Sequence, residues 1–127
     1  MNANANSINW FEISVSDIGR AKKFYESIFG ISMETQEMMG MQMAFFPWTP
    51  GSGKANGGLV QSDMHKPSAD GVKIYLNCDP DLQQVLDKVA KAGGQIIMQK
   101  TDIGEGMGFM AFIIDTEGNV IALHSNG

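Results

Sequence analysis

The residues best suited to chemistry lie close together near the start of the chain. Trp10 and Glu12 are two positions apart in an apolar stretch, so the alternation of a β-strand places both on one face. The indole of Trp10 could stack on a ligand. The carboxylate of Glu12 could act as a general base or recognise a cationic or hydroxylated group. Structural roles stay open for both, as sheet packing for the indole and as half of an ion pair for the carboxylate.

The two histidines and the single cysteine give weaker signals. His124 lies near the end of the last predicted strand, where an imidazole suits acid–base work, although a lone histidine at a strand end is more often a surface or packing residue. We interpret His65, in a polar connector, as solvated. Cys78 precedes Asp79 and Asp81, whose charges would raise its pKa and not activate it. One cysteine also excludes an internal disulfide and a multi-cysteine metal site.

Composition narrows the class of protein. The 127 residues, 43% hydrophobic and 18% charged, are typical of one packed domain. Nine Lys and Arg against 14 Asp and Glu give a net charge of −5 with no basic stripe, which argues against a nucleic-acid partner. The apolar runs are too short to span a membrane, and the polar start has no signal-peptide pattern. We therefore expect a cytoplasmic protein without a membrane partner.

The pattern of the first half of the chain predicts a strand, a helix and three strands, in that order. We expect residues 1–7 to be disordered and residues 8–15 to form a strand. Asp17 can cap a helix, and Gly30 can end it. Three strands should follow, at residues 31–36, 41–46 and 57–61.

The same order returns after a polar connector at residues 62–71. Residues 72–78 predict a strand, and Asp79, Pro80 and Asp81 suit a helix start. The helix should bury an apolar face made of Leu82, Val85, Leu86, Val89 and Ala90. Three more strands are predicted, at residues 95–99, 108–114 and 119–124.

These two halves indicate a duplicated module. The tetrapeptide that begins at Met43 (MAFF) returns almost unchanged 67 positions later at Met110 (MAFI). We therefore predict an α+β fold of two tandem βαβββ modules that form a curved mixed sheet with a central cleft. The modules would span residues 8–61 and 72–127, with residues 62–71 as the linker, inside one structural domain. A cleft between modules is a usual place for a small ligand.

Two motifs give the chain a family resemblance. The opening run NWFEISVSD, from Asn9 to Asp17, and the closing run DTEGNVI, from Asp115 to Ile121, resemble those of the vicinal oxygen chelate superfamily. That superfamily contains glyoxalase I, the bleomycin and fosfomycin resistance proteins and extradiol dioxygenases. The resemblance implies the fold predicted above, a small-molecule ligand and a homodimer.

The resemblance also implies four metal-ligand positions, and this chain departs from the family at each of them. Counted from the motifs, the positions fall at Trp10, Gly58, Lys73 and Ala122. None of these side chains donates a lone pair to a divalent cation at neutral pH. We therefore predict no metal and no other cofactor. The alternative is a relocated metal site around Glu12 and His124.

These predictions lead to three alternative hypotheses for the function. The first is a metal-independent small-molecule binding protein with a hydrophobic and aromatic pocket. The second is a metal-dependent lyase or dioxygenase that uses the relocated site. The third is a structural or regulatory dimer whose hollow is filled by its own side chains. The candidate ligand-binding residues are Trp10, Glu12, Phe45, Lys73, Tyr75, Phe112 and His124. Glu12 is expected to pair with Lys73 or Tyr75, its matching positions on the fifth strand.

Overall fold

The computed structural model describes the whole chain, Met1–Gly127, as eight strands and two helices. In chain order they are β1 (Trp10–Ser14), α1 (Ile18–Phe29), β2 (Glu34–Met38), β3 (Met41–Phe45), β4 (Asn56–Gln61), β5 (Tyr75–Asn77), α2 (Gln83–Val89), β6 (Gln95–Asp102), β7 (Phe109–Ile114) and β8 (Val120–Ser125). This is the predicted α+β class, with two βαβββ modules in succession. No helix is long and apolar enough to cross a membrane.

The strands form two four-stranded mixed sheets of the same topology. One has the order β1-β4-β3-β2 and the other has the order β5-β8-β7-β6. In each sheet the first and last strands of the module pair in parallel, and the remaining pairs are antiparallel. The equal topology agrees with the repeat seen in the sequence.

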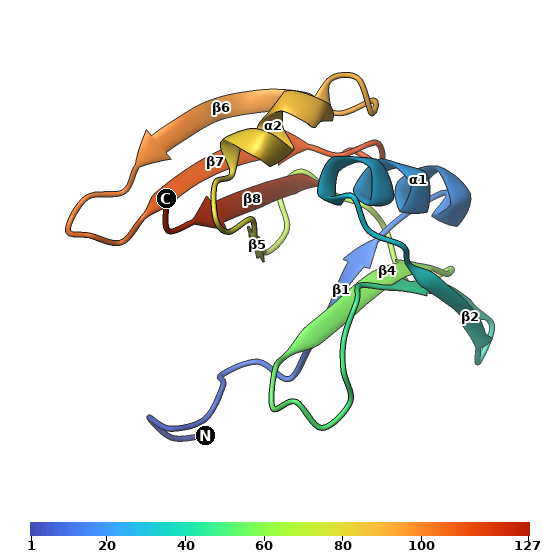
Figure 1. Ribbon diagram of the computed structural model, residues 1–127. Coiled ribbons are helices and arrows are strands. Elements are labelled where there is room, and N and C mark those ends of the chain that lie inside the picture. Colours follow the sequence, from blue (N-terminus) through green and yellow to red (C-terminus); the bar gives the residue numbers. More distant parts are fainter.

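The two modules share one hydrophobic core. Nineteen buried residues form a single cluster that includes Ile13 and Leu59 of the first sheet and Ile113 and Leu123 of the second. Both helices contribute to this cluster and contact each other. Figure 1 shows α1 lying between the two sheets. Each sheet therefore turns one face to this core and leaves its other face open.

The ends of α1 are set by local chemistry. The Asp17 carboxylate accepts a hydrogen bond from the Arg20 backbone N–H at 3.0 Å, which caps the first turn. Gly30 ends the helix with φ 64°, a left-handed conformation that glycine adopts without a Cβ penalty. Both helix-end predictions are confirmed.

Several predicted boundaries are wrong, and long-range packing explains the first of them. β2 begins at Glu34 and not at Ile31, because the Met33 N–H donates to the Glu26 carboxylate and its side chain enters the core. β5 covers only Tyr75–Asn77 of the strand predicted for residues 72–78. β6 continues to Asp102 with two register shifts against β7. Ala90, predicted on the buried face of α2, is exposed just beyond the end of that helix.

A turn near the chain end fixes the modules to each other. Glu117 accepts hydrogen bonds from the backbone N–H groups of Ser16 and Asp17, both at 2.9 Å. It also accepts two from the Arg20 guanidinium, at 2.7 and 2.9 Å. Burial alone would raise the pKa of Glu117, but these bonds and one from the Thr116 hydroxyl outweigh it and hold the pKa at about 2.

Two neighbours of Glu117 extend this contact. The buried Tyr25 hydroxyl donates to Asp115 at 2.8 Å, and Asn119 donates to the Ser14 carbonyl at 2.8 Å. All side-chain hydrogen bonds between residues 8–61 and 72–127 come from Asp115, Glu117 and Asn119. We call this set of three residues the closing-turn clamp.

Candidate functional site

Three of the predicted site residues lie on the open face of the first sheet. Phe11 and Ile13 turn toward the core, so Trp10 and Glu12 point the other way. The Trp10 ring meets that of Phe45 edge to face, with centroids 5.7 Å apart. The Trp10 indole N–H donates to Glu12 Oε2 at 3.2 Å. Trp10, Glu12 and Phe45 therefore form one contiguous group.

Glu12 has a different partner from the one that the sequence predicts. Its Oε1 lies 2.8 Å from His65 Nε2, whereas Lys73 donates to the carbonyl oxygens of Ala69 and Gly71. The predicted contacts of Glu12 with Lys73 or Tyr75 are therefore wrong. Lys73 lies in the bend before β5, where its ammonium group closes the loop instead.

His65 is the site residue that the sequence analysis missed. Its side chain is only 18% exposed, so the interpretation as a solvated residue is wrong. His65 Nδ1 lies 2.6 Å from Ser62 Oγ, and a bridge between Ser62 and His65 turns the ring back toward β1. Because a carboxylate only accepts, the Nε2 atom donates to Glu12. A Ser-x-x-His spacing at the end of β4 is the only local signal for this turn.

The second sheet holds Tyr75, Phe112 and His124 in a separate group. Tyr75 and Phe112 meet edge to face on its open side, with ring centroids 6.3 Å apart. His124 Nε2 lies 2.8 Å from the Met107 carbonyl oxygen, which ties it to the loop before β7. No hydrogen bond or aromatic contact joins this group to Trp10, Glu12 and Phe45. Within one chain, the candidate residues therefore occupy two faces.

The register of the two sheets locates the four family metal positions. The Val15 N–H donates to Val60, and the Cys78 N–H donates in the same way to His124. These two hydrogen bonds occupy the same place in the two sheets. Counting back from them along the paired strands matches Trp10 with Lys73 and Gly58 with Ala122.

These four residues do not fit a metal. An indole, a lysine and an alanine supply no ligand at neutral pH, and a Cβ at Gly58 would lie 2.6 Å from the Ala44 carbonyl oxygen. No group of three or more His, Cys, Asp or Glu side chains converges anywhere in the chain. Glu12 and His124, the centre of the relocated alternative, are each bonded to other partners.

A groove of about 810 Å³ lies between the two modules. The wall from module 1 contains Phe11, Phe29 and Phe46, and the ring of Phe46 lies 5.8 Å from Phe11 and 6.5 Å from Phe29. β5 and α2 supply the other wall, with Tyr75 and Gln84 among its residues. Of the seven predicted ligand-binding residues, Lys73 and Tyr75 line this groove.

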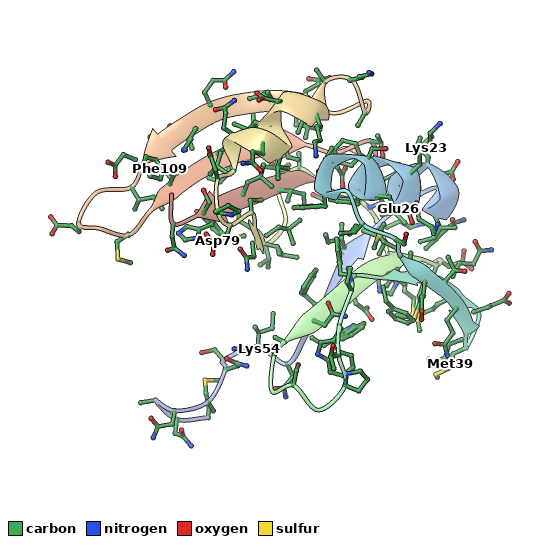
Figure 2. The ribbon with its side chains drawn as sticks, in the orientation of Figure 1. Lys23, Glu26, Met39, Lys54, Asp79 and Phe109 are labelled. Atoms are coloured by element: carbon green, nitrogen blue, oxygen red, sulfur yellow. The ribbon has the colours of Figure 1, made fainter.

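Charged side chains of both signs also line the groove. They are Lys73, Asp79, Asp81 and Lys88, and Figure 2 marks Asp79 beside β5. A hydrogen bond from Lys100, with a second from the Gln83 N–H, holds the pKa of Asp81 below its usual range.

The Cys78 thiol, also in the groove wall, is not activated. Burial raises the pKa of Cys78 to about 12, and the Asp79 charge acts in the same direction. The predicted direction is confirmed, so the thiol is a neutral part of the wall.

The edge of β5 adds unpaired backbone groups to this wall. Ala122 donates to the Ile74 carbonyl, and the Cys78 N–H donates to His124. In a parallel pair this pattern turns the N–H and C=O groups of Tyr75 and Asn77 away from β8. The groove therefore combines an aromatic wall, charged groups and free backbone donors and acceptors.

Comparisons with known proteins agree on the family. The profile of the Glyoxalase/Bleomycin resistance protein/Dioxygenase superfamily matches residues 7–123. A "Glyoxylase-like domain-containing protein" of Didymella fabae is 31% identical, over 91% of both chains. "Putative glyoxylase CFP32" of Mycobacterium tuberculosis is 32% identical over 91% of this chain, but this chain spans only 44% of that protein.

Solved structures share the fold. Hypothetical protein SA1046 of S. aureus has a TM-score of 0.66 at 20% identity, and the alignment covers 96% of this chain and 95% of that one. Glyoxalase I of Zea mays has a TM-score of 0.66 at 19% identity and covers 93% of this chain and 45% of its own. At this identity the likeness supports the fold alone.

Proposed function

This chain belongs to the Glyoxalase/Bleomycin resistance protein/Dioxygenase superfamily, and we propose that within it the chain is a metal-independent small-molecule binding protein. The observation that carries the proposal is the groove between the modules, with its aromatic wall from module 1 and its charged residues from module 2. A pocket that is mainly apolar and has a few polar groups is the usual form of a small-molecule site.

The chemistry of the groove favours an amphipathic ligand. The three phenylalanines offer contact area to a flat apolar body. Lys73 and Lys88 can pair with an anionic group, and Asp79 can pair with a cationic one, whereas Asp81 is already paired with Lys100. The free N–H and C=O groups of the β5 edge suit a ligand with its own donors and acceptors. The groove contains no activated nucleophile, because its thiol has a raised pKa.

Metal independence rests on the residues at the four family positions. Each position lacks a donor for a divalent cation, and this holds whether the two modules that form a site come from one chain or from two copies. The homodimer implied by the family, and a cytoplasmic location that suits a single free cysteine, are parts of the same proposal.

The test is a titration with anilinonaphthalene sulfonate, an amphipathic aromatic probe, in the presence of a chelator. Gln84 is an exposed groove residue on α2, so Gln84→Trp should fill the groove without disturbing the core. Ala90→Trp is a matched control, since Ala90 is exposed, next to α2 and outside the groove lining.

We expect saturable binding that the chelator does not change. Gln84→Trp should weaken this binding by about tenfold, while Ala90→Trp leaves it unchanged. Binding that needs an added metal, or that both variants weaken equally, would overturn the proposal.

A further inference from the structure

A second cavity lies on the module 1 side of the molecule, outside the groove between the modules. It has a volume of about 520 Å³ and is bounded by the loop between β3 and β4. Six of its nine lining residues are aromatic or proline: Trp10, Phe45, Phe46, Pro47, Trp48 and Pro50. Its only charged lining residue is Glu34. Both tryptophans of the chain therefore line one cavity, together with the carboxylate of Glu34.

The polar atoms of both indoles are already occupied. The Trp10 N–H donates to Glu12 at 3.2 Å, and the Trp48 N–H donates to the Lys54 carbonyl at 3.0 Å. Trp10 and Trp48 are 38% and 49% exposed as whole residues. What they present to a ligand is therefore the π-surface and not a hydrogen-bond donor. The face of an aromatic ring carries negative charge density and attracts cations.

The walls are held in place before any ligand arrives. Asn56 is buried and donates its side-chain N–H to the Phe46 carbonyl at 3.0 Å, and the Phe46 N–H donates to Gly57. These bonds close the base of the loop that carries Trp48, and the hydrogen bond to Lys54 spans it. A rigid wall lowers the entropy cost of binding. Figure 2 shows Lys54 on this loop.

The charges around the cavity favour a cationic guest. Glu34 lines the cavity, and Glu12 accepts the hydrogen bond of the Trp10 indole N–H. No lysine, arginine or histidine side chain lines it. The one cation–π contact within the chain is that of Lys100 with Phe109 in module 2, so no cation of the protein fills this cavity.

We propose that this aromatic cage, made of Trp10, Phe45, Trp48 and Glu34, binds a small molecule with a quaternary ammonium group. A primary ammonium needs an acceptor for each of its three N–H donors, whereas most of the lining is aromatic or proline and its polar side chains are limited to Ser32, Glu34 and Asn56. A quaternary ammonium has no N–H donors, so π-faces and one carboxylate satisfy it. This site goes beyond the function proposed for the groove, although the two cavities share Phe46 and Pro47.

Choline and its uncharged isostere 3,3-dimethylbutan-1-ol test the proposal, because the two differ only in the charged atom. Tryptophan fluorescence reports the titration directly, since both indoles line the cage. We expect choline to bind roughly tenfold more tightly than the isostere. Equal binding of the two compounds, or no saturable response to choline, would overturn the proposal.

Two variants locate the effect, and both change exposed residues. Trp48→Leu should remove the preference for choline, and its circular dichroism should show an unchanged fold. Glu34→Gln should weaken choline binding several-fold, whereas Glu37→Gln, the same charge change on β2 outside the cage, should not.

Equal losses in the two glutamine variants would contradict the proposal. So would a Trp48→Leu protein that still prefers choline. Gln84→Trp should leave choline binding unchanged, which separates the cage from the groove.

Discussion

The two modules meet in two contrasting ways. At the closing-turn clamp, Asp115, Glu117 and Asn119 supply every side-chain hydrogen bond that joins the modules. At the groove, aromatic side chains of module 1 and charged side chains of module 2 face a space of about 810 Å³ and make no such bond across it. The two regions therefore have different roles. The clamp fixes the relative position of the modules by hydrogen bonds, whereas the groove, whose lining includes residues of the shared core, leaves open space for a ligand.

The largest expected effect comes from removing the charge of the clamp. Glu117→Gln loses the ion pair with Arg20 and weakens the bonds from two backbone N–H groups. Because the Glu117 side chain has no exposed surface, we expect the free energy of unfolding to fall by about 3 kcal/mol. Urea denaturation measures this change. Glu105→Gln, the same substitution on an exposed loop, should leave the free energy of unfolding unchanged, and an equal loss in both variants would contradict the clamp.

Acid should weaken the clamp in a defined range. The pKa of Glu117 is about 2 in the folded protein against 4.5 for the unperturbed group, so the carboxylate stabilises the fold fully above pH 4.5. That stability is lost as the pH falls from about 4.5 toward 2, by roughly 2 to 3 kcal/mol.

Unfolding curves of the native chain and of Glu117→Gln should therefore converge at low pH. Asp81 and Glu26 also have lowered pKa values, but they are present in both proteins and cancel in this comparison. A constant gap between the two proteins from pH 7 to pH 2 would contradict the assignment.

A smaller effect is expected at the buried end of the clamp. Tyr25→Phe removes the hydroxyl that donates to Asp115, but Asp115 keeps bonds from Asn119 and from the Glu117 backbone N–H. We expect a loss of about 1.5 kcal/mol, measured by thermal or urea unfolding. A loss as large as that of Glu117→Gln would mean that the tyrosine, and not the carboxylate, holds the modules together.

The smallest effect is expected at the groove. Gln84→Trp should change the free energy of unfolding by less than about 0.5 kcal/mol, although it fills the space between the walls. A large change in stability would show that the groove is a structural element of the fold, and the contrast with the clamp would fail.

Local rules predicted the elements of this fold well. The cap at Asp17 and the stop at Gly30 depend on neighbouring residues alone, and both appear in the structure. The repeat predicted the order of helices and strands along the chain in the same way, because each module carries its own copy of the local pattern. The start of β2 was missed because Met33 is tied to Glu26 and buried in the core, a contact that no periodicity reveals.

The candidate site was harder to predict because its contacts join distant parts of the chain. His65 and Glu12 are 53 positions apart, and only the turn at Ser62 brings them together. The groove arises where module 1 residues such as Phe29 face β5 and α2 of module 2, so its phenylalanines gave no signal as a set. Trp48 was not among the predicted residues, since a tryptophan in a turn-rich loop shows its role only once Trp10 lies beside it.

The most direct test of the central claim, that this member of the family works without a metal, is the metal content of the purified native protein. It is measured by native mass spectrometry after incubation with zinc, nickel, manganese or iron(II) and removal of excess ion. We predict no bound metal at one ion per chain, and probe binding that is the same before and after this treatment. A tightly held ion in stoichiometric amount, with probe binding that depends on it, would contradict the account.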